Sequence, residues 1–213
     1  MTMLTDVAKL QVFFVAAAIL LLTPGPAVLY IVARSIEHGR FAGIVSTLGI
    51  AVGTLFHVAA AAFGVSIILM TSAAAFAVLK YVGAAYLVYL GVRTILSGAG
   101  NRQTERKPTR LSAIFFQGVW VNVLNPKTAL FFFAFLPQFV DVNAGRIGIQ
   151  MFVLGMAFVA MGIVSDGAWA LAAGTAGDWL RRHTRVLRAQ RFFSGGVMIA
   201  LGLVAALTST SKD

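Results

Sequence analysis

The sequence contains no cysteine, so a disulfide framework and thiolate metal sites are excluded. Acidic residues are also scarce, because only 7 of the 213 residues are Asp or Glu. Charged residues make up 11% of the chain, whereas about a quarter is usual in soluble domains. Apolar residues make up 59%. These proportions indicate an integral membrane protein without a sizeable soluble domain.

The sequence also lacks the short motifs that mark several enzyme classes. It has no Walker A loop, no H-E-x-x-H and no G-x-S-x-G, so ATP use, zinc proteolysis and serine hydrolysis of these types are unsupported. An intramembrane enzyme would need a cluster of acid–base or metal-binding side chains, and the chain has only 3 histidines. We therefore predict no catalytic residue, no metal site and no cofactor.

Long uncharged stretches define the predicted membrane spans. A bilayer core about 30 Å thick needs roughly 20 apolar residues in a helix. Residues 10–33 and 41–79 contain no Asp, Glu, Lys or Arg, and the second stretch is long enough for a hairpin of two helices with its turn near residues 70–72. We predict six spans, at residues 10–33, 42–69, 73–96, 111–139, 147–177 and 192–208.

Basic residues lie mostly on one side of these spans. With the N-terminus outside, the cytoplasmic links hold twelve Lys and Arg residues, against three on the other side: Lys9, Arg146 and Lys212. The positive-inside rule therefore places both termini outside, on the side away from the cytoplasm. The same distribution accounts for the net charge of +10, so no nucleic-acid partner is predicted.

A polar, basic linker divides the chain into two halves of three spans each. Because three is odd, the second half enters the membrane from the opposite face, as in the inverted-topology repeats of many secondary transporters. We predict an all-α, polytopic membrane protein with a single membrane domain, 1–213. Its parts are repeat one, 1–97, a cytoplasmic linker, 98–110, and repeat two, 111–213.

Proline breaks interrupt the first and fourth predicted helices. Pro24, Gly25 and Pro26 lie in the first, and Pro126 lies in the fourth. A proline lacks an N–H group, so the carbonyl four residues before it loses its helical donor. In lipid such a carbonyl is tolerated only where protein or a water-filled cavity satisfies it. Paired breaks in the two halves of a transporter therefore point to its binding site.

The freed carbonyls belong to Leu20 and Leu22 in the first helix and to Asn122 in the fourth. Asn125 and Lys127 adjoin the second break. The N-terminus of a half-helix carries partial positive charge, so this break with its lysine suits a carboxylate ligand. The alternative is a proline kink that polar side chains satisfy. Since the halves enter from opposite faces, we expect the breaks to flank a central site at opposed depths.

Three ionisable side chains within the predicted spans are further candidates. Asp at a helix centre costs about 2.5–3.5 kcal/mol on insertion scales, so we predict that Asp166 binds a proton or a substrate amino group. A structural hydrogen bond is the alternative. A histidine ordinarily titrates near neutral pH, so His57 is a candidate for a proton relay, although a satisfied core histidine is the commoner finding. Lys80 either binds a carboxylate or extends to the membrane interface.

Gly49 and Gly53 form a GxxxG pattern that lets two helices approach closely. Packing within the monomer is the first interpretation, and a homodimer is the alternative.

Several motifs along nearly the whole chain resemble those of the LysE/RhtB-type amino-acid exporters. They are Thr23-Pro24-Gly25-Pro26, Arg34 with Gly39-Arg40 and Gly43, Leu79-Lys80 with residues 83–87 and Leu90-Gly91, Leu124-Asn125-Pro126-Lys127, and residues 135–139. The resemblance implies a bacterial cytoplasmic-membrane protein that exports amino acids such as lysine, threonine, homoserine or leucine, driven by the proton-motive force.

The leading hypothesis is a proton-coupled exporter of an amino acid or a close derivative. In this hypothesis Asp166, with His57, takes the proton or the substrate ammonium, and Lys127 and Lys80 meet the carboxylate. Export of a cation or another small metabolite is the alternative within transport. An intramembrane enzyme acting on a lipid and a non-transporting membrane scaffold are the alternatives outside it.

Overall fold

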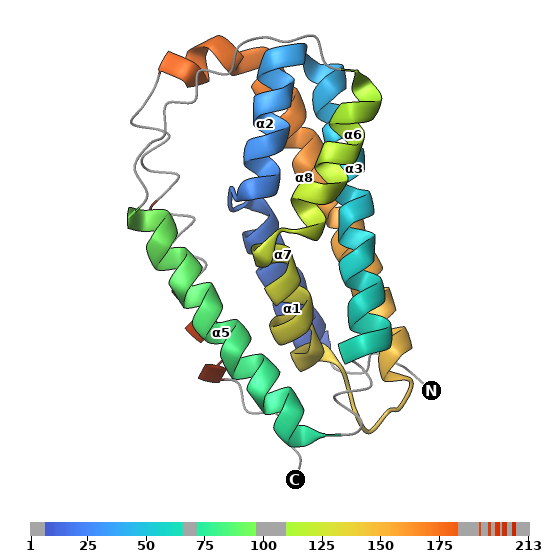
Figure 1. Cartoon of the computed structure of the whole chain (residues 1–213). Coiled ribbons are helices and arrows are strands. Elements are labelled where there is room, and N and C mark those ends of the chain that lie inside the picture. The colour runs from blue at the N-terminus through green and yellow to red at the C-terminus, as the bar shows by residue number, and fades with distance from the viewer. Residues whose placement is uncertain are drawn as a thin grey trace.

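The computed structural model of the chain describes residues 7–65, 72–96 and 110–182, with further helical positions at 192, 196, 199–200, 202–203 and 206–207. The described part is built of helices and contains no strand (Figure 1). Most of the predicted linker, most of the predicted hairpin turn and most of the sixth predicted span lie outside these residues.

The first predicted span is a bent pair of helices. Helix α1 (Val7–Leu22) ends directly before the Thr23–Gly25 break, and α2 (Pro26–His38) begins at Pro26, where a missing N–H costs the helix nothing. Gly25 caps α2 in an extended conformation. The two axes differ by 46°.

A glycine turn leads into the next helix. Gly39 has a φ of 88°, a left-handed conformation that favours glycine, and α3 (Arg40–Ala59) begins at the following residue. A π-helical turn, η1 (Ala60–Val65), extends α3. The third predicted span corresponds to α5 (Ala73–Leu96).

The fourth predicted span is also bent at its proline. Helix α6 (Leu111–Val123) and α7 (Pro126–Leu130) are followed by a π-helical turn, η2 (Phe131–Phe135), and a 3₁₀ turn, η3 (Leu136–Phe139). The bend is 45°. This broken helix runs opposite to the α1–α2 pair (Figure 1). Helix α8 (Ile147–Arg182) follows, and it extends beyond the predicted end at residue 177.

Two of the described helical stretches, Arg40–Val65 and Ile147–Thr175, are long and apolar enough to cross a membrane. The number rises to four if each bent pair counts as one span. The chain is therefore a helical membrane protein, and the layout of six spans in two inverted repeats stays a prediction.

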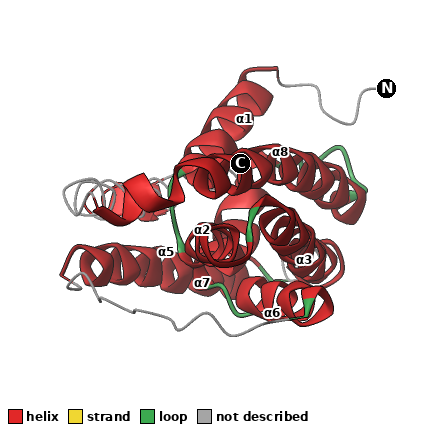
Figure 2. Cartoon of the chain, turned by 90° about the horizontal axis from the view of Figure 1, so that it is seen from above, coloured by secondary structure: helices red, strands yellow, loops and turns green. Residues whose placement is uncertain are grey.

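Helix α3 packs closely against α6, and α8 and α2 complete the central bundle, with α5 along one side (Figures 1 and 2). The GxxxG glycines make this approach possible. A Cβ added at Gly49 would lie 2.3 Å from the carbonyl oxygen of Phe115, and one at Gly53 would lie 2.7 Å from that of Val119. The pattern therefore serves packing within the chain, the first interpretation of the sequence.

Phenylalanine side chains fill the core between α1, η2 and α8. Phe131 stacks on Phe158 with ring centroids 4.5 Å apart, and Phe13 packs against Phe131 at 6.1 Å. All three rings are buried. This packing holds the part of the fourth predicted helix that follows the second break against α8.

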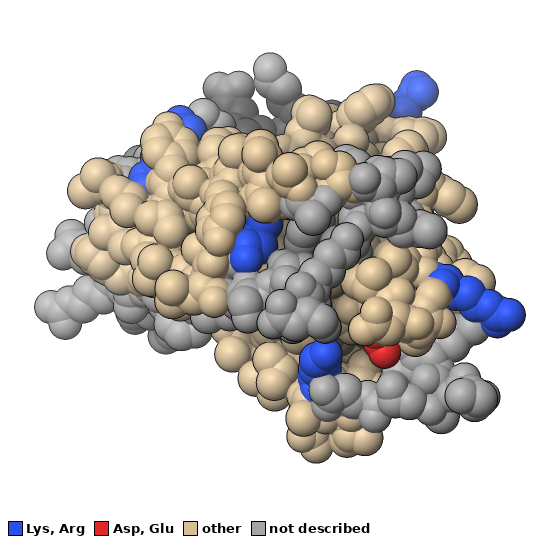
Figure 3. Space-filling model, turned by 90° about the horizontal axis from the view of Figure 1, so that it is seen from below, with Lys and Arg blue, Asp and Glu red and all other residues tan. Residues whose placement is uncertain are grey.

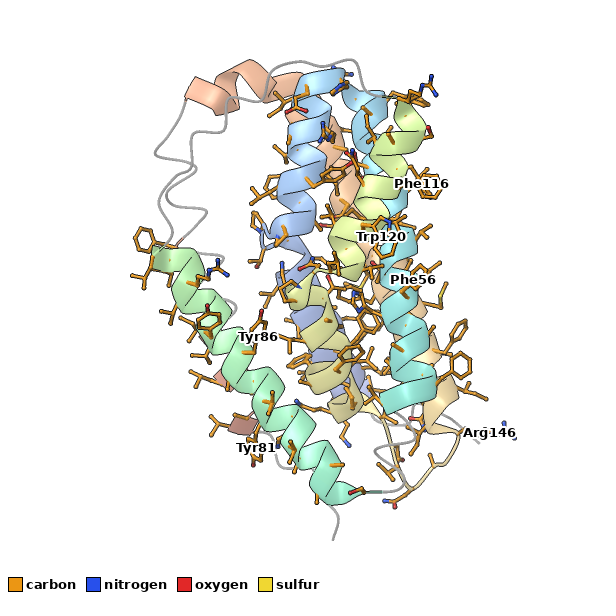
Figure 4. The ribbon with its side chains drawn as sticks, viewed as in Figure 1. Phe56, Tyr81, Tyr86, Phe116, Trp120 and Arg146 are labelled. Atoms are coloured by element: carbon orange, nitrogen blue, oxygen red, sulfur yellow. The ribbon has the colours of Figure 1, made fainter. Side chains whose placement is uncertain are left out.

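The outer face of the bundle is apolar and aromatic. Phe56 on α3 and Phe116 and Trp120 on α6 point away from the bundle, and their exposed fractions are 59%, 62% and 62% (Figure 4). Tyr81 and Tyr86 on α5 are also exposed. Such a surface suits contact with lipid. Among the described residues, the surface seen from below is mostly uncharged, with separate basic side chains and little acidic surface (Figure 3).

Candidate functional site

A small buried cavity lies where the two broken helices meet α3 and α8. Its volume is about 40 Å³. The polar side chains that line it are Thr54, Asn122, Asn125, Lys127, Thr128 and Asp166. The apolar wall consists of Leu20, Leu21, Val28, Ile50, Phe158, Val159 and Ile163, and small residues are present at Gly25, Ala27, Ala51 and Gly162.

Lys127 of the second break satisfies one of the two carbonyls that the first break frees. It is the second residue of α7, and its ammonium donates hydrogen bonds to the carbonyl oxygens of Leu20 (2.6 Å) and Thr23 (2.5 Å). The Leu20 carbonyl is the one that loses its helical donor to Pro24. Because the C-terminal end of a helix carries partial negative charge, α1 is a favourable partner for this ammonium.

The lysine side chain reaches α1 because Gly25 leaves it room. A Cβ at Gly25 would lie 3.0 Å from Cδ of Lys127, closer than most real contacts. Pro24 and Gly25 are buried, whereas Pro26 is exposed. The two breaks are therefore in direct contact, as a site between them requires.

The carbonyl freed by Pro126 also has its own donors. His57 on α3 places Nε2 2.9 Å from the carbonyl oxygen of Asn122, and the backbone N–H of Asn125 donates to the same oxygen at 3.0 Å. Because a carbonyl only accepts, Nε2 is the protonated ring nitrogen. The buried imidazole stacks on Phe132. This geometry fits the satisfied core histidine that the sequence left as an alternative.

The side chain of Asn122 is the centre of a hydrogen-bonded network. Its amide nitrogen donates to the Ile50 carbonyl (2.9 Å) and to Oγ1 of Thr54 (2.8 Å) on α3. Its Oδ1 accepts from Thr128 (3.0 Å) and Asn125 (3.2 Å). Every hydrogen-bonding group of this buried amide has a partner, which holds the second break rigidly against α3.

The second break also has a helix cap. Oδ1 of Asn125 accepts a hydrogen bond from the backbone N–H of Lys127 at 3.1 Å, so it satisfies one of the free donors of α7. Asn125 therefore has a structural role beside its position on the cavity wall.

Asp166 faces the same cavity from α8. Its exposed fraction is 6%, and among the described residues no group donates a hydrogen bond to its carboxylate. It interacts electrostatically with Lys127 without forming a direct ion pair. A buried carboxylate without hydrogen bonds is costly unless a positive group meets it. The cavity thus offers one ammonium and one available carboxylate.

The structure does not bring Lys80 to this cavity. Lys80 lies on α5, is buried, and places its ammonium 4.8 Å from the centre of the Tyr81 ring. It is absent from the residues that line the cavity. Of the predicted site residues, Gly25, Asn122, Asn125, Lys127 and Asp166 line the cavity, whereas Pro24, Pro26, Pro126 and His57 do not.

The sequence did not single out Thr54, Thr128 or the apolar α8 wall. The Thr54 hydroxyl donates to the Ile50 carbonyl one turn back, which is a common arrangement in apolar helices. A threonine at this position therefore does not indicate a binding site. Thr128 follows the second break directly, and its position next to this break could have identified it as a candidate. Gly162 lies four residues before Asp166, on the same face of α8.

A helical membrane bundle with two contacting helix breaks around a buried cavity is the arrangement of a membrane transporter. The sequence matches the model of the LysE type translocator family over residues 18–209, and the chain belongs to this family. The protein is therefore a transporter and not an enzyme, which removes the intramembrane enzyme from the alternatives.

The chain is similar to several bacterial membrane proteins. It is 28% identical over 213 aligned positions to the uncharacterised membrane protein YrhP of Bacillus subtilis, with 94% of this chain and 99% of that protein covered. It is 32% identical over 145 positions to the leucine efflux protein of Salmonella typhimurium (67% and 68% covered). The leucine efflux protein of Klebsiella pneumoniae is 31% identical over 146 positions (68% and 69%). No solved structure matches the chain.

Proposed function

We propose that this protein exports a neutral aliphatic amino acid from the bacterial cytoplasm across the inner membrane, driven by the proton-motive force. The observation that carries the proposal is the pair of Lys127 and Asp166 on one buried cavity between the two helix breaks. The leucine efflux proteins among the relatives support the same substrate class. Six spans, periplasmic termini and inverted repeats belong to the proposal.

The two charges match the two charges of an amino acid. The substrate carboxylate would bind the ammonium of Lys127, and the substrate ammonium would bind the carboxylate of Asp166. The remaining wall is mainly aliphatic and aromatic, with Leu21, Val159 and Ile163 among its members. A charged substrate side chain would be desolvated there without a partner, so an uncharged, apolar side chain is favoured.

Substrate binding would change the contacts of the first break. Lys127 now holds the carbonyls of Leu20 and Thr23. When its ammonium turns to a carboxylate, these carbonyls lose their donor and the α1–α2 joint is released. The cavity of about 40 Å³ is also smaller than sites for drug-sized ligands, which occupy about 300–1,000 Å³. Binding would therefore widen the space between α1 and α8.

Proton coupling would use the carboxylate that the substrate vacates. After the substrate ammonium leaves Asp166 on the periplasmic side, a proton binds the carboxylate in its place. The neutral acid returns, and the next substrate ammonium displaces the proton on the cytoplasmic side. Each exported amino acid is thereby exchanged for a proton at Asp166.

The variant Asp166→Asn tests this exchange of substrate and proton. Cells that express the protein are fed a leucine dipeptide, whose hydrolysis loads leucine inside, and leucine in the medium is measured with and without an inward proton gradient. We expect the wild type to export faster with the gradient. The variant keeps the shape of the side chain but binds no proton. We therefore expect it to lose the part of leucine export that depends on the proton gradient.

Asp141→Asn is the matched control. The Asp141 carboxylate accepts hydrogen bonds from the backbone N–H groups of Asn143 and Ala144 in a loop, which an asparagine carbonyl also accepts. We expect this variant to respond to the gradient like the wild type. If Asp166→Asn did so as well, at equal protein levels, the coupling role of Asp166 would be wrong. Export of a cation but of no amino acid would overturn the proposed substrate class.

A further inference from the structure

Gly162 forms part of the cavity wall beside the proposed substrate-binding carboxylate. It lies on α8, which lines the cavity with Phe158, Val159, Gly162, Ile163 and Asp166. Of these, Phe158, Gly162 and Asp166 are spaced four residues apart. Such spacing puts the three on one face of the helix. The absence of a side chain at Gly162 therefore leaves open space between Phe158 and Asp166.

Packing does not require a glycine at this position. A Cβ at Gly162 would have one neighbour within 4 Å, Cδ2 of Leu21 at 3.5 Å, which is ordinary van der Waals contact. By contrast, a Cβ at Gly155 on the same helix would lie 2.9 Å from both methyl groups of Val58. Glycine also lowers helix stability relative to alanine by about 1 kcal/mol. Neither packing nor helix stability explains Gly162.

We propose that Gly162 sets the upper size limit of the substrate side chain. This inference rests on the proposed function and deepens it. With the substrate ammonium at Asp166, its side chain would extend over the next turn of α8, along Gly162 towards Phe158. A methyl group at residue 162 would point at Leu21 and occupy the space that a branched C4 side chain needs. A one-carbon side chain would still fit.

The test compares two substrates in one assay. Cells expressing wild type, Gly162→Ala or Gly167→Ala are fed leucine or alanine dipeptides, and the ratio of leucine to alanine export is measured at equal protein levels. In Gly162→Ala we expect the ratio to fall about tenfold, the lower range for one methylene in an apolar pocket. We expect alanine export to fall much less than leucine export.

Gly167→Ala is the matched control on the same helix. A Cβ there would have no neighbour within 4 Å, and Gly167 does not line the cavity. We expect it to leave the ratio unchanged. Leu21→Ala is the second variant, because it removes the side chain that a methyl group at residue 162 would touch. As a single change, Leu21→Ala should raise the ratio of leucine to alanine export. Combined with Gly162→Ala, it should return the ratio towards the wild-type value.

The outcomes separate this inference from the proposed function. If the wild type exports leucine and Gly162→Ala lowers export of both amino acids equally, or leaves the ratio unchanged, Gly162 does not set the size limit and the proposed function stands. A ratio in the double variant that stays as low as in Gly162→Ala would also overturn the inference. If the wild type exports neither amino acid, the proposed function fails and the inference fails with it.

Discussion

The two helix breaks have nearly the same bend, 46° and 45°, but their freed carbonyls are satisfied in different ways. At the second break, the Asn122 carbonyl accepts from His57 and from the backbone of Asn125. At the first break, the Leu20 carbonyl accepts from Lys127, which belongs to the other half of the chain. One break is held by an imidazole N–H and a backbone N–H, and the other by the ammonium at the end of a long side chain.

This difference assigns the breaks different mechanical roles. The second break is part of a network in which Asn122, Thr54 and Thr128 satisfy one another, so moving any member leaves a buried polar group unpaired. The first break depends on an ammonium that a carboxylate substrate would attract. We therefore expect the second break to stay fixed against α3 during transport and the first to open.

The largest effect is expected from Lys127→Met. This change leaves the carbonyls of Leu20 and Thr23 without their donor and removes the positive charge from the cavity. Unsatisfied buried groups cost about 1–3 kcal/mol each, so the thermal stability of the purified protein should fall. Loss of the charged hydrogen bond to substrate, worth about 1.5–3 kcal/mol, should lower leucine export by at least tenfold.

Lys80→Met provides the comparison, because Lys80 is also a buried lysine but does not line the cavity. We expect a smaller loss of export than in Lys127→Met, measured in the same dipeptide-fed cells. If Lys80→Met were the more damaging change, Lys80 would be the carboxylate partner. The role of Lys127 would then be limited to holding α1.

A moderate effect is expected from Asn122→Ala, which disrupts the second break. The change removes four side-chain hydrogen bonds, to Ile50, Thr54, Thr128 and Asn125. Hydrogen bonds between membrane helices contribute about 0.6 kcal/mol on average, so we expect a loss of about 2 kcal/mol in unfolding free energy.

The measurement for Asn122→Ala is thermal unfolding in detergent, with Asn143→Ala, at an exposed position of the 141–145 loop, as the matched control. The control should unfold like the wild type. If Asn122→Ala were as stable as the control, the second break would not be held by this network. The distinction between a fixed and an opening break would then have no structural basis.

Much of the site follows from covalent structure and the cost of polar groups in lipid. Proline identifies which carbonyls lose their donors, so Leu20, Leu22 and Asn122 were predictable from Pro24, Pro26 and Pro126. The cost of a charge in the membrane singled out Asp166 as a candidate, and the structure places this residue on the cavity wall. The family follows from motifs that continue along nearly the whole chain.

The donors of those carbonyls were not predictable, because they come from residues far away in the sequence. Lys127 lies more than a hundred residues from Leu20 in the sequence. The positions of Lys80 and Lys127 along their predicted spans do not show which lysine reaches the first break. The π-helical turns η1 and η2 also carry no local signal, because their sequences suit an α-helix equally well. These features depend on how the helices pack.

The smallest effect is expected from His57→Gln, which asks whether His57 only holds the second break or also transfers protons. A glutamine amide can donate to the Asn122 carbonyl in place of Nε2, but it does not titrate. If the role is structural, His57→Gln should keep stability and gradient-dependent export within about twofold of the wild type. His57→Leu should instead lose about 1–3 kcal/mol, because the buried carbonyl keeps only the Asn125 donor.

The two variants together separate the roles of His57. A stable His57→Gln protein that no longer responds to the proton gradient would place His57 in the proton path, together with Asp166. The second break would then resemble the first in carrying a group whose charge changes during transport. With both breaks depending on such a group, neither would be the fixed one, and the two halves would move in equivalent ways.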